Sequence, residues 1–563
     1  MIRMLPTPCR LASAVLLALA VAGCQSPAAV PAVTTAVTTA VTPASAPWVA
    51  DLGDGRFRNP VLHSDYSDPD AIRVGDTYYM TSSSFNAVPG LPLLTSPDMV
   101  NWTLVGHALP RLLPLERYAS ARHGEGVWAP SLRHHDGKFW IFYPDPDVGI
   151  FVTTATTFSG PWSQPRLLLA GKGIIDPTPL WDDDGKAYLL HAWARSRAGF
   201  NNVLTLRRMA PDASRLLDDK GQVVIDGNAL PNYRTLEGPK LYKHDGYYYV
   251  FAPAGGVEEG WQSVFRARSI AGPYEARIVM DQGETPINGP HQGAWVRAQD
   301  GKDWFLHFQD RKAYGRVVHL NPMRWADGWP VIGEDNPRTA ASGAGQPVLS
   351  HAKPVAGGRF AAPPATDEFD APRLGLQWQW NANPDPRWAS LSERPGMLRL
   401  HTQPAPAFAD YVRGAPSLLT QKLPAPSFVV DTHVRFNDAR EGERAGLIVN
   451  AMQYGWIGLR QTGGVMQLVS GACTPARERC REATTVLLSP APAALHLRMT
   501  MAEGARARFW YSLDNVNFVA AGQPLEISKG RWVGAQVGLF SIGKQPATTT
   551  SSLDVDYFRV TAK

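Results

Sequence analysis

The sequence has few of the features that build helical or nucleic-acid-binding proteins. Charged residues make up only 19% of the 563 residues, and no long run of alternating charges marks an exposed helix. Proline and glycine are plentiful instead, with 48 and 50 copies. Turns should therefore outnumber helix interiors, which favours an all-β chain. Lysine and arginine are scattered without a basic run or interleaved aromatic residues, so the net charge of +5 does not indicate nucleic-acid binding.

Long apolar runs are also missing, apart from one at the N-terminus. Arg3 and Arg10 precede the apolar segment 11–20, which is followed by Val21-Ala22-Gly23-Cys24. This order is typical of an export signal. Small residues directly before a cysteine are similar to the bacterial lipobox, in which Cys24 would be lipidated and become the first mature residue. The alternative is an ordinary signal peptide with a chance cysteine.

The predicted localisation follows from this leader. We expect residues 1–23 to be a lipoprotein signal peptide, and residues 24–50, rich in Ala, Val, Thr and Pro, to be a flexible linker. The protein would then be exported and lipid-anchored in the bacterial cell envelope, meeting the membrane only through that anchor. Gln25 is not the inner-membrane retention residue aspartate, which favours the outer membrane or the periplasm.

Cysteine is scarce, with four copies in the chain. Cys9 and Cys24 belong to the leader, which leaves Cys473 and Cys480. In an oxidising compartment we expect these two to form a local disulfide, with two free thiols as the alternative. The loop between them lies far in sequence from the candidate catalytic residues, so its role would be structural.

One short pattern recurs five times in the first two thirds of the chain. Each copy is a glycine turn followed by an aromatic-rich strand, and the interval is roughly 50 to 60 residues. The copies begin at Gly75, Asp136, Asp184, Asp245 and Asp300. Asp-Gly before aromatic and β-branched residues is a strong hairpin signal, and this spacing suits a four-stranded blade. We predict a five-bladed β-propeller over 51–350, with a generic β-sandwich as the alternative.

A distinctive residue stands roughly seven to ten positions before each turn glycine, an offset that a repeated unit would preserve. These residues are Asp68, Trp128, Asp176, Glu237 and His291. If each begins the innermost strand of its blade, all five face the central cavity. Three carboxylates would then meet. Paired carboxylates are the usual machinery of glycoside hydrolysis, although most Asp-Pro pairs taken singly are turn residues.

Together these motifs are similar to glycoside hydrolase family 43. The resemblance rests on Ser67-Asp68-Pro69-Asp70, Val127-Trp128-Ala129-Pro130, Ile175-Asp176-Pro177, Glu237-Gly238-Pro239-Lys240 and Asn288-Gly289-Pro290-His291. It implies an inverting mechanism with Asp68 as general base, Glu237 as general acid, and Asp176 raising the pKa of Glu237 and orienting it. The two catalytic carboxyl groups of an inverting enzyme lie about 6.5 to 9.5 Å apart, which leaves room for the attacking water.

The same resemblance suggests roles for Arg316 and His291, and two aromatic residues are candidates for the pocket walls. Arg316 resembles the family arginine that hydrogen-bonds a pentose hydroxyl, with a surface ion pair as the alternative. His291 resembles a histidine near the substrate or a channel metal, often calcium bound through water; a core histidine bonded to backbone is the alternative. Trp128 and Phe85 would form apolar walls around one sugar ring, unless they only pack.

The sequence pattern changes after the Pro- and Ala-rich stretch around 351–365. Short apolar strands without the propeller hairpin predict a β-sandwich over 361–563. This part resembles the concanavalin-like domain that follows the propeller in many family 43 pentosidases. A structural calcium ion near Asp367 and Asp556 is possible there, whereas catalysis should need no cofactor.

The leading hypothesis is an exo-acting β-D-xylosidase or α-L-arabinofuranosidase that removes terminal pentoses from plant cell-wall polysaccharide or its oligosaccharides. The two activities share one pocket because the two sugars present similar hydroxyls. An endo-arabinanase with an open cleft is the second possibility. A non-catalytic carbohydrate-binding surface protein is the third, although the presence of all three acids speaks against it.

Overall fold

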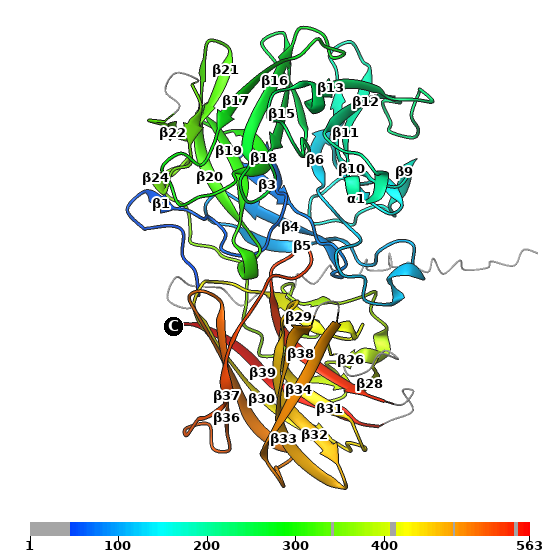
Figure 1. Ribbon diagram of the computed structural model, residues 1–563, viewed down its shortest axis with the longest axis vertical. Coiled ribbons are helices and arrows are strands. Elements are labelled where there is room, and N and C mark those ends of the chain that lie inside the picture. Colours follow the sequence, from blue (N-terminus) through cyan, green and yellow to red (C-terminus); the bar gives the residue numbers. More distant parts are fainter. Residues whose placement is uncertain (1–45, 339–342, 406–411, 477–478, 545–549) are drawn as a thin grey trace, which may run out of the picture. The chain divides into compact units, whose positions relative to one another are not determined.

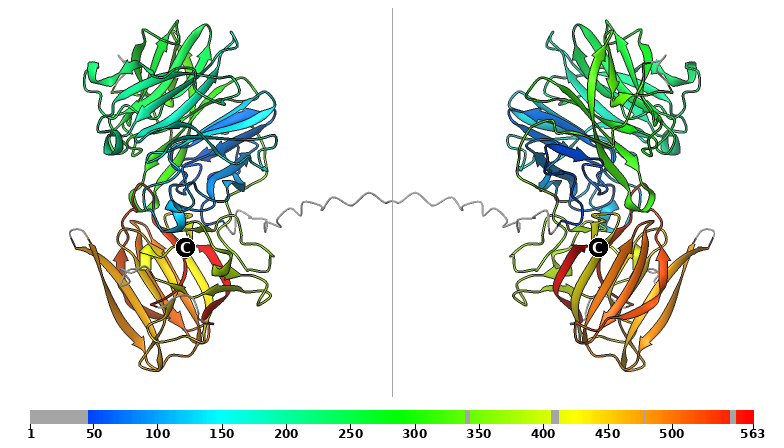
Figure 2. Two further views of the ribbon diagram at one scale, coloured as in Figure 1. Left: turned by 90° about the vertical axis from the view of Figure 1, so that its right-hand side faces the viewer. Right: turned by 90° about the vertical axis from the view of Figure 1, so that its left-hand side faces the viewer.

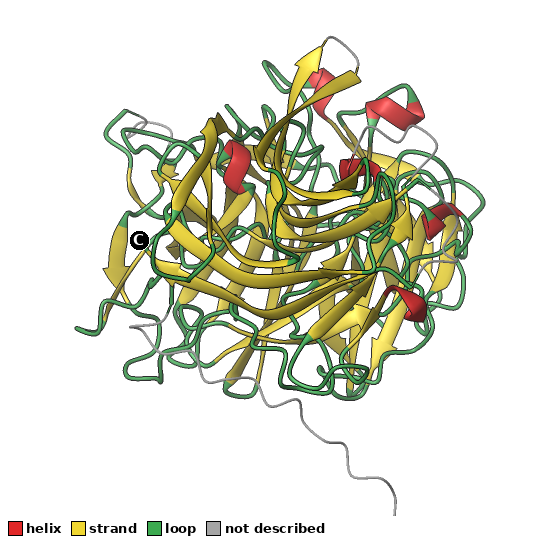
Figure 3. Cartoon of the chain, turned by 90° about the horizontal axis from the view of Figure 1, so that it is seen from below, coloured by secondary structure: helices red, strands yellow, loops and turns green. Residues whose placement is uncertain are grey.

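The computed structural model describes residues 46–338, 343–405, 412–476, 479–544 and 550–563. These residues are almost entirely strands and turns (Figure 3). Their only α-helix is α1 (Arg195–Ala198), and none of their helices is long and apolar enough to cross a membrane. Short 3-10 helices are η1 (Arg117–Ala119), η2 (Gly227–Ala229), η3 (Lys312–Tyr314), η4 (Pro386–Trp388) and η5 (Val412–Gly414).

The N-terminal two thirds form five antiparallel four-stranded blades, coloured from blue to green in Figure 1. Blade 1 contains β2 (Asp70–Val74), β3 (Thr77–Thr81), β4 (Gly90–Ser96) and β5 (Thr103–Leu109). Blade 2 contains β6 (Ser131–His135), β7 (Lys138–Asp145), β8 (Gly149–Ala155) and β9 (Arg166–Ala170). Blade 3 contains β10 (Ile174–Trp181), β11 (Ala187–Trp193), β12 (Val203–Met209) and β13 (Gln222–Asp226).

Blade 4 contains β14 (Lys240–His244), β15 (Tyr247–Ala254), β16 (Trp261–Ala267) and β17 (Glu275–Met280), extended at its edge by β23 (Gly345–Gln346) and β22 (Glu334–Asp335). Blade 5 contains β18 (His291–Arg297), β19 (Asp303–Asp310), β20 (Arg316–Ala326) and β21 (Trp329–Ile332). Outside the blades, β1 (Arg56–Arg58) pairs antiparallel with β24 (Ser350–Ala352), which ties the start of this domain to its end.

The five predicted hairpins are the turns between the first and second strand of each blade. Two of them place two consecutive residues at positive φ: Asp136 and Gly137 at 49° and 68°, and Asp245 and Gly246 at 47° and 74°. Aspartate tolerates this left-handed conformation and glycine adopts it without strain, which is why the Asp-Gly pair recurs. The prediction of a five-bladed propeller is confirmed.

The C-terminal part is a sandwich of two largely antiparallel sheets, and Figure 2 shows them from two sides. One sheet contains β25 (Gln379–Trp380), β29 (Leu419–Lys422), β38 (Gln536–Gly543), β31 (Arg444–Asn450), β32 (Gly455–Thr462), β33 (Val465–Ala476) and β34 (Arg479–Leu488), with β28 (Gln403–Pro404) beside β38. The other contains β26 (Ala389–Ser390), β27 (Leu398–His401), β39 (Ser552–Ala562), β30 (Phe428–Asn437), β35 (Ala494–Ala502), β36 (Arg506–Ser512) and β37 (Val519–Glu526). The predicted sandwich is confirmed as well.

The propeller and the sandwich are joined by hydrogen bonds and by shared packing. Ala313 and Tyr314, which belong to the propeller, are part of the same buried cluster as the sandwich core. The Tyr314 hydroxyl donates to the Pro426 carbonyl at 2.8 Å and accepts the Ala505 N–H at 2.8 Å. The sandwich is therefore not a loosely tethered module, because a propeller side chain completes its core.

The end of the predicted linker is packed. Ala46 and Ala50 are buried. The Trp48 Nε1 donates to the Pro60 carbonyl at 2.9 Å, and the Arg58 guanidinium lies over the Trp48 ring. Residues 46–50 of the predicted linker 24–50 are therefore packed and not flexible. Removing the apolar Trp48 ring from water favours this packing.

Several predictions fall outside the described residues. These are the signal peptide 1–23, Cys9, the lipidated Cys24, and the linker over 24–45. Cys473 is disulfide-bonded. The side chain of Cys480 is not among those described, so the pairing of these two cysteines stays a prediction.

Candidate active site

Three acidic side chains meet where the innermost strands of blades 1, 3 and 4 begin. Asp68 lies two residues before β2, Asp176 is the third residue of β10, and Glu237 lies three residues before β14. Asp68 and Asp176 both have positive φ, at 54° and 53°. Each precedes a proline, which has no N–H for a ladder, and the register of β10 shifts between Ile175 and Thr178. These irregular strand starts leave the carboxylates free of the sheet.

Asp68 is surrounded by hydrogen-bond donors. Its Oδ2 accepts the Ser67 hydroxyl at 2.7 Å and the Ser83 hydroxyl at 2.6 Å. Arg316 Nη1 lies 3.0 Å from Oδ1 and 3.2 Å from Oδ2, and also donates to Ser67. Such charge-assisted contacts hold a carboxylate in one orientation. Asp68 is 5% exposed, so a water or substrate can reach only a small part of it.

The surroundings of Asp176 and Glu237 raise the pKa of both carboxyl groups. Burial raises the pKa of Asp176, and the charge of Asp68 adds to the rise, while the Gly238 N–H, which donates to Asp176 Oδ2 at 2.7 Å, opposes it. Burial likewise raises the pKa of Glu237, followed by the negative charges of Asp176 and Asp68, while Arg316 opposes the rise. A neutral carboxyl group can therefore persist near neutral pH beside a charged one, which is the arrangement that acid–base catalysis needs.

His291 begins β18 and approaches the acids from blade 5. Its Nε2 lies 3.5 Å from Glu237 Oε1, and its ring packs against Phe308. Burial lowers the pKa of His291 to about 3, so the imidazole is neutral. Arg316 is the first residue of β20, and its guanidinium lies over the ring of the same Phe308, 4.8 Å from the ring centroid. Both predicted residues therefore lie at the carboxylate cluster.

Phe85 and Trp128 form an aromatic wall, with ring centroids 6.2 Å apart. The backbones of Phe85 and Val127 exchange two hydrogen bonds, which fixes Phe85 at a φ of 50°. A Cβ on Gly126 would lie 2.3 Å from the Phe85 carbonyl oxygen, so this close approach requires glycine. The Arg197 guanidinium covers Trp128, 5.3 Å from its ring centroid.

A loop of the sandwich reaches the same wall. The ring centroid of Trp532, which is 43% exposed, lies 6.0 Å from that of Trp128. Lys529 Nζ pairs with Glu258 Oε1 of the propeller at 2.9 Å. A cavity beside Arg316 is lined by this loop and by propeller residues, among them Val257 and Lys312. The sandwich loop therefore lies beside Arg316, which contacts the acidic cluster.

The structure brings together the predicted residues Asp68, Asp176, Glu237, His291 and Arg316. The predicted Phe85 and Trp128 contact each other, and Phe85 lies two residues after Ser83, which donates to Asp68. Sequence reasoning missed Ser83, Arg197 and Trp532. No motif marks them, because each reaches the site only through the fold. Ser67, by contrast, lies inside the Asp68 motif, and its sequence position alone could have indicated the hydrogen bond from its hydroxyl to Asp68.

Asp367 and Asp556 do not form a metal site with their neighbours. The carboxylate of Asp367 accepts the N–H groups of Phe369, Gly375 and the Trp378 indole. Asp556 approaches His433 at 3.4 Å. Among the described residues, no group of three or more His, Cys, Asp or Glu side chains is placed to hold a metal ion. The calcium prediction gains no support from these two residues.

Comparison with known proteins assigns both domains. Residues 57–330 match the model for glycosyl hydrolases family 43, and residues 366–561 match that for the beta xylosidase C-terminal concanavalin A-like domain. A putative beta-xylosidase of Xylanibacter ruminicola is 38% identical over 490 residues, which is 87% of this chain and 86% of the relative. The chain belongs to glycosyl hydrolases family 43. The resemblance predicted from the sequence is thus confirmed, and this family 43 protein is a glycosidase.

Further relatives of this family 43 enzyme carry two activities in their names. The non-reducing end alpha-L-arabinofuranosidase BoGH43B of Bacteroides ovatus is 29% identical over 91% of this chain and 96% of the relative. The solved xylan beta-1,4-xylosidase of Bacillus halodurans C-125 is 25% identical, with a TM-score of 0.77 over 90% of this chain and 99% of that one. Family 43 enzymes need no cofactor for catalysis.

The electrostatics of this site yields a titration that can be measured without substrate. Replacing Asp176 by asparagine removes a negative charge beside Glu237 and keeps an acceptor for the Gly238 N–H. The pKa of Glu237 should therefore fall, yet stay above that of an exposed glutamate because burial remains. Carboxyl-carbon NMR of selectively labelled protein, with Glu237→Gln for assignment, measures it. An unchanged or higher value would contradict the assigned role of Asp176.

Proposed function

We propose that the protein is an exo-acting, inverting glycosidase that releases terminal β-D-xylose, α-L-arabinofuranose or both from hemicellulose or its oligosaccharides. Asp68 is the general base, Glu237 the general acid, and Asp176 raises the pKa of Glu237 and orients it. The observation that carries this proposal is that Asp68, a carboxylate held by Arg316, acts electrostatically on Glu237, a buried carboxyl group whose pKa is raised.

The reaction follows from these two states. Glu237 donates its proton to the glycosidic oxygen as the bond from that oxygen to the anomeric carbon breaks. Asp68 accepts a proton from a water molecule, whose oxygen attacks the opposite face of the same carbon. Both carboxyl groups have then exchanged protonation states, and a proton returns to Glu237 through solvent. The separation of about 6.5 to 9.5 Å between them remains a prediction.

The proposed sugar contacts come from four residues. Arg316 donates to a pentose hydroxyl with the guanidinium nitrogens that Asp68 leaves free. Phe85 and Trp128 provide apolar surface for one sugar face. His291 contacts the substrate or a water molecule, because its buried ring nitrogens have no hydrogen-bond partner among the described residues.

Exo action and pentose specificity are supported by the rim and by the relatives. We infer that the sandwich loop at Trp532, which contacts Trp128, narrows the approach, as a pocket for a chain end requires. The relatives are named for β-xylosidase and for α-L-arabinofuranosidase activity. An endo-arabinanase, which needs an open cleft, and a non-catalytic binding protein are therefore the weaker alternatives.

The test is sugar release from aryl β-D-xylopyranoside, aryl α-L-arabinofuranoside, xylobiose and linear arabinan. We expect monosaccharides only. Glu237→Gln should lower kcat about 10²- to 10⁴-fold on xylobiose but far less on a dinitrophenyl xyloside, whose leaving group needs no proton. Glu284→Gln, a half-exposed glutamate elsewhere in the propeller, should leave both rates unchanged.

Other results would redirect the proposal. Oligosaccharides released from arabinan would favour the endo-arabinanase, and no turnover of any pentoside would favour the binding protein. Equal losses on xylobiose and on the dinitrophenyl xyloside would contradict the role of Glu237 as the acid.

A calcium ion, if bound, is proposed to be structural. We propose that the neutral, buried imidazole of His291 contacts the ion through a bound water molecule. A direct bond is less favourable, because the described residues offer no cluster of metal ligands around His291. A rise in melting temperature on adding Ca²⁺ to chelator-treated protein would support the ion, and an unchanged melting temperature would contradict it.

We also propose that the protein is a lipoprotein of the bacterial cell envelope, acting on plant cell-wall fragments. The support is the leader with Cys24 after Val21-Ala22-Gly23. In a bacterial host, Cys24→Ser should move the enzyme from the membrane fraction to the soluble fraction without changing its kcat/KM. A mutant that stays in the membrane fraction would contradict the anchor.

A further inference from the structure

Asp65 lies three residues before Asp68 and is almost completely buried, at 5% exposure. Its two carboxylate oxygens each accept one backbone N–H from a distant segment. Oδ1 accepts the N–H of Arg316 at 2.8 Å, and Oδ2 accepts the N–H of Gly534 at 2.8 Å. One carboxylate therefore joins the propeller strand β20 to the sandwich loop that carries Trp532.

The contact is possible only because two glycines meet there. A Cβ on Gly315, whose φ is 75°, would lie 2.3 Å from Asp65 Cγ. A Cβ on Gly534 would lie 2.6 Å from the Gly315 nitrogen. Ala535 adds a backbone hydrogen bond to the Ala313 carbonyl at 2.7 Å. The backbone before Arg316 is thus held from both sides, by Asp65 and by the sandwich.

Arg316 transmits this constraint to the acidic cluster. Its backbone is fixed by Asp65, and its side chain donates to Ser67 and Asp68. Asp65, Ser67 and Asp68 belong to one short segment. That segment therefore binds both the backbone and the side chain of Arg316, which restricts the orientation of the guanidinium relative to Asp68.

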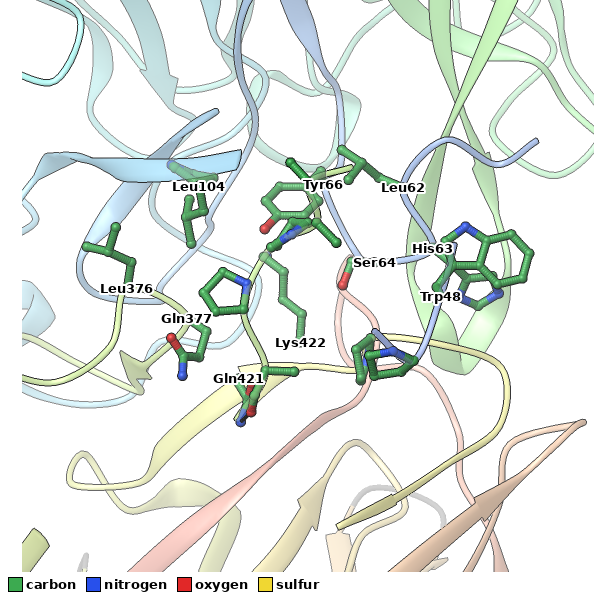
Figure 4. A pocket seen from close by; sticks show the side chains of 18 of the residues that line it. Trp48, Leu62, His63, Ser64, Tyr66, Leu104, Leu376, Gln377, Gln421 and Lys422 are labelled. Atoms are coloured by element: carbon green, nitrogen blue, oxygen red, sulfur yellow. Dashed lines mark hydrogen bonds between the residues drawn. The ribbon is translucent and has the colours of Figure 1, made fainter. Parts of the chain in front are cut away.

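The charge of Asp65 is offset from the sandwich side. Burial raises the pKa of Asp65, and Lys422 of β29 is the largest influence that opposes the rise. Figure 4 shows the Lys422 side chain in a cavity between the domains, among Tyr66, Ser64 and Gln421. Its Nζ lies 5.3 Å from the Tyr66 ring centroid. A sandwich cation therefore favours the charged form of a propeller carboxylate.

We propose that Asp65 is a positioning residue that fixes Arg316 against Asp68 and ties that point to the sandwich at Gly534. Asp65 touches neither substrate nor reacting atoms, and it acts through Arg316. The inference rests on the proposed function, because it holds that Asp65 and Arg316 together orient Asp68, the proposed general base.

A double-mutant cycle tests the route of action. The carboxamide in Asp65→Asn can accept only one of the two N–H groups. In the otherwise wild-type enzyme it should lower kcat/KM about 10- to 100-fold. In the Arg316→Ala enzyme, where the residue to be positioned has lost its side chain, the same change should cost less than about 2-fold.

The matched control is Asp98→Asn. Asp98 is another buried carboxylate that accepts two backbone N–H groups, those of Val100 and Asn101, and none of its hydrogen-bond partners belongs to the site. It should leave kcat/KM within about 2-fold in both backgrounds. If Asp65→Asn does not fold, Gly534→Ala serves instead, because its Cβ must push the loop away from Gly315 and Asp65.

The outcomes separate this inference from the proposed function. A wild-type enzyme without activity on any pentoside would remove the proposed function itself. An active wild type in which folded Asp65→Asn is unimpaired, or in which it loses the same factor with and without the Arg316 side chain, would overturn the positioning role alone. Losses confined to the background with Arg316 support it.

Discussion

The repulsion among the carboxyl groups of Asp68, Asp176 and Glu237 is the constraint on which the rest of the site depends. Burial makes each charge costly, and each carboxylate disfavours ionisation of the next. Arg316 donates hydrogen bonds to Asp68, and its charge also opposes part of the rise in the pKa of Glu237. The result is an asymmetric pair: one acid engaged by a cation, and another whose pKa is raised by burial and by its neighbours. That asymmetry is what the proposed roles of Asp68 as base and Glu237 as acid require at a single pH.

The second theme is that the sandwich supports this asymmetry from outside the propeller. Tyr314 is buried with the sandwich core, and Gly534 and Ala535 bond to the residues around Arg316. The segment that presents the cation to Asp68 is thus held by both domains. Loss of the sandwich would therefore remove more than the wall at Trp532, because it would also release the backbone that aims the guanidinium.

Local sequence rules predicted the parts of the fold that depend on local chemistry. The Asp-Gly turns, such as Asp245-Gly246, were found because positive φ restricts the choice of residue. Asp68, Asp176 and Glu237 were found because a repeated blade keeps their offset from those turns. Gly534, 469 residues from its partner Asp65, was out of reach, because no periodicity links a sandwich loop to a propeller turn. Trp48 was missed for the same reason, since a flexible composition does not reveal a pocket made by distant residues.

The stereochemistry of the first sugar released tests the central claim most directly. If Asp68 activates water while Glu237 protonates the leaving group, an aryl β-D-xyloside must yield α-xylose before mutarotation. Proton NMR of the anomeric signals in the first minutes of hydrolysis, with the enzyme at high concentration, distinguishes the two anomers. Initial α-xylose is the result that the account predicts. Initial β-xylose would mean that a covalent sugar intermediate forms, and would contradict the roles given to these two acids.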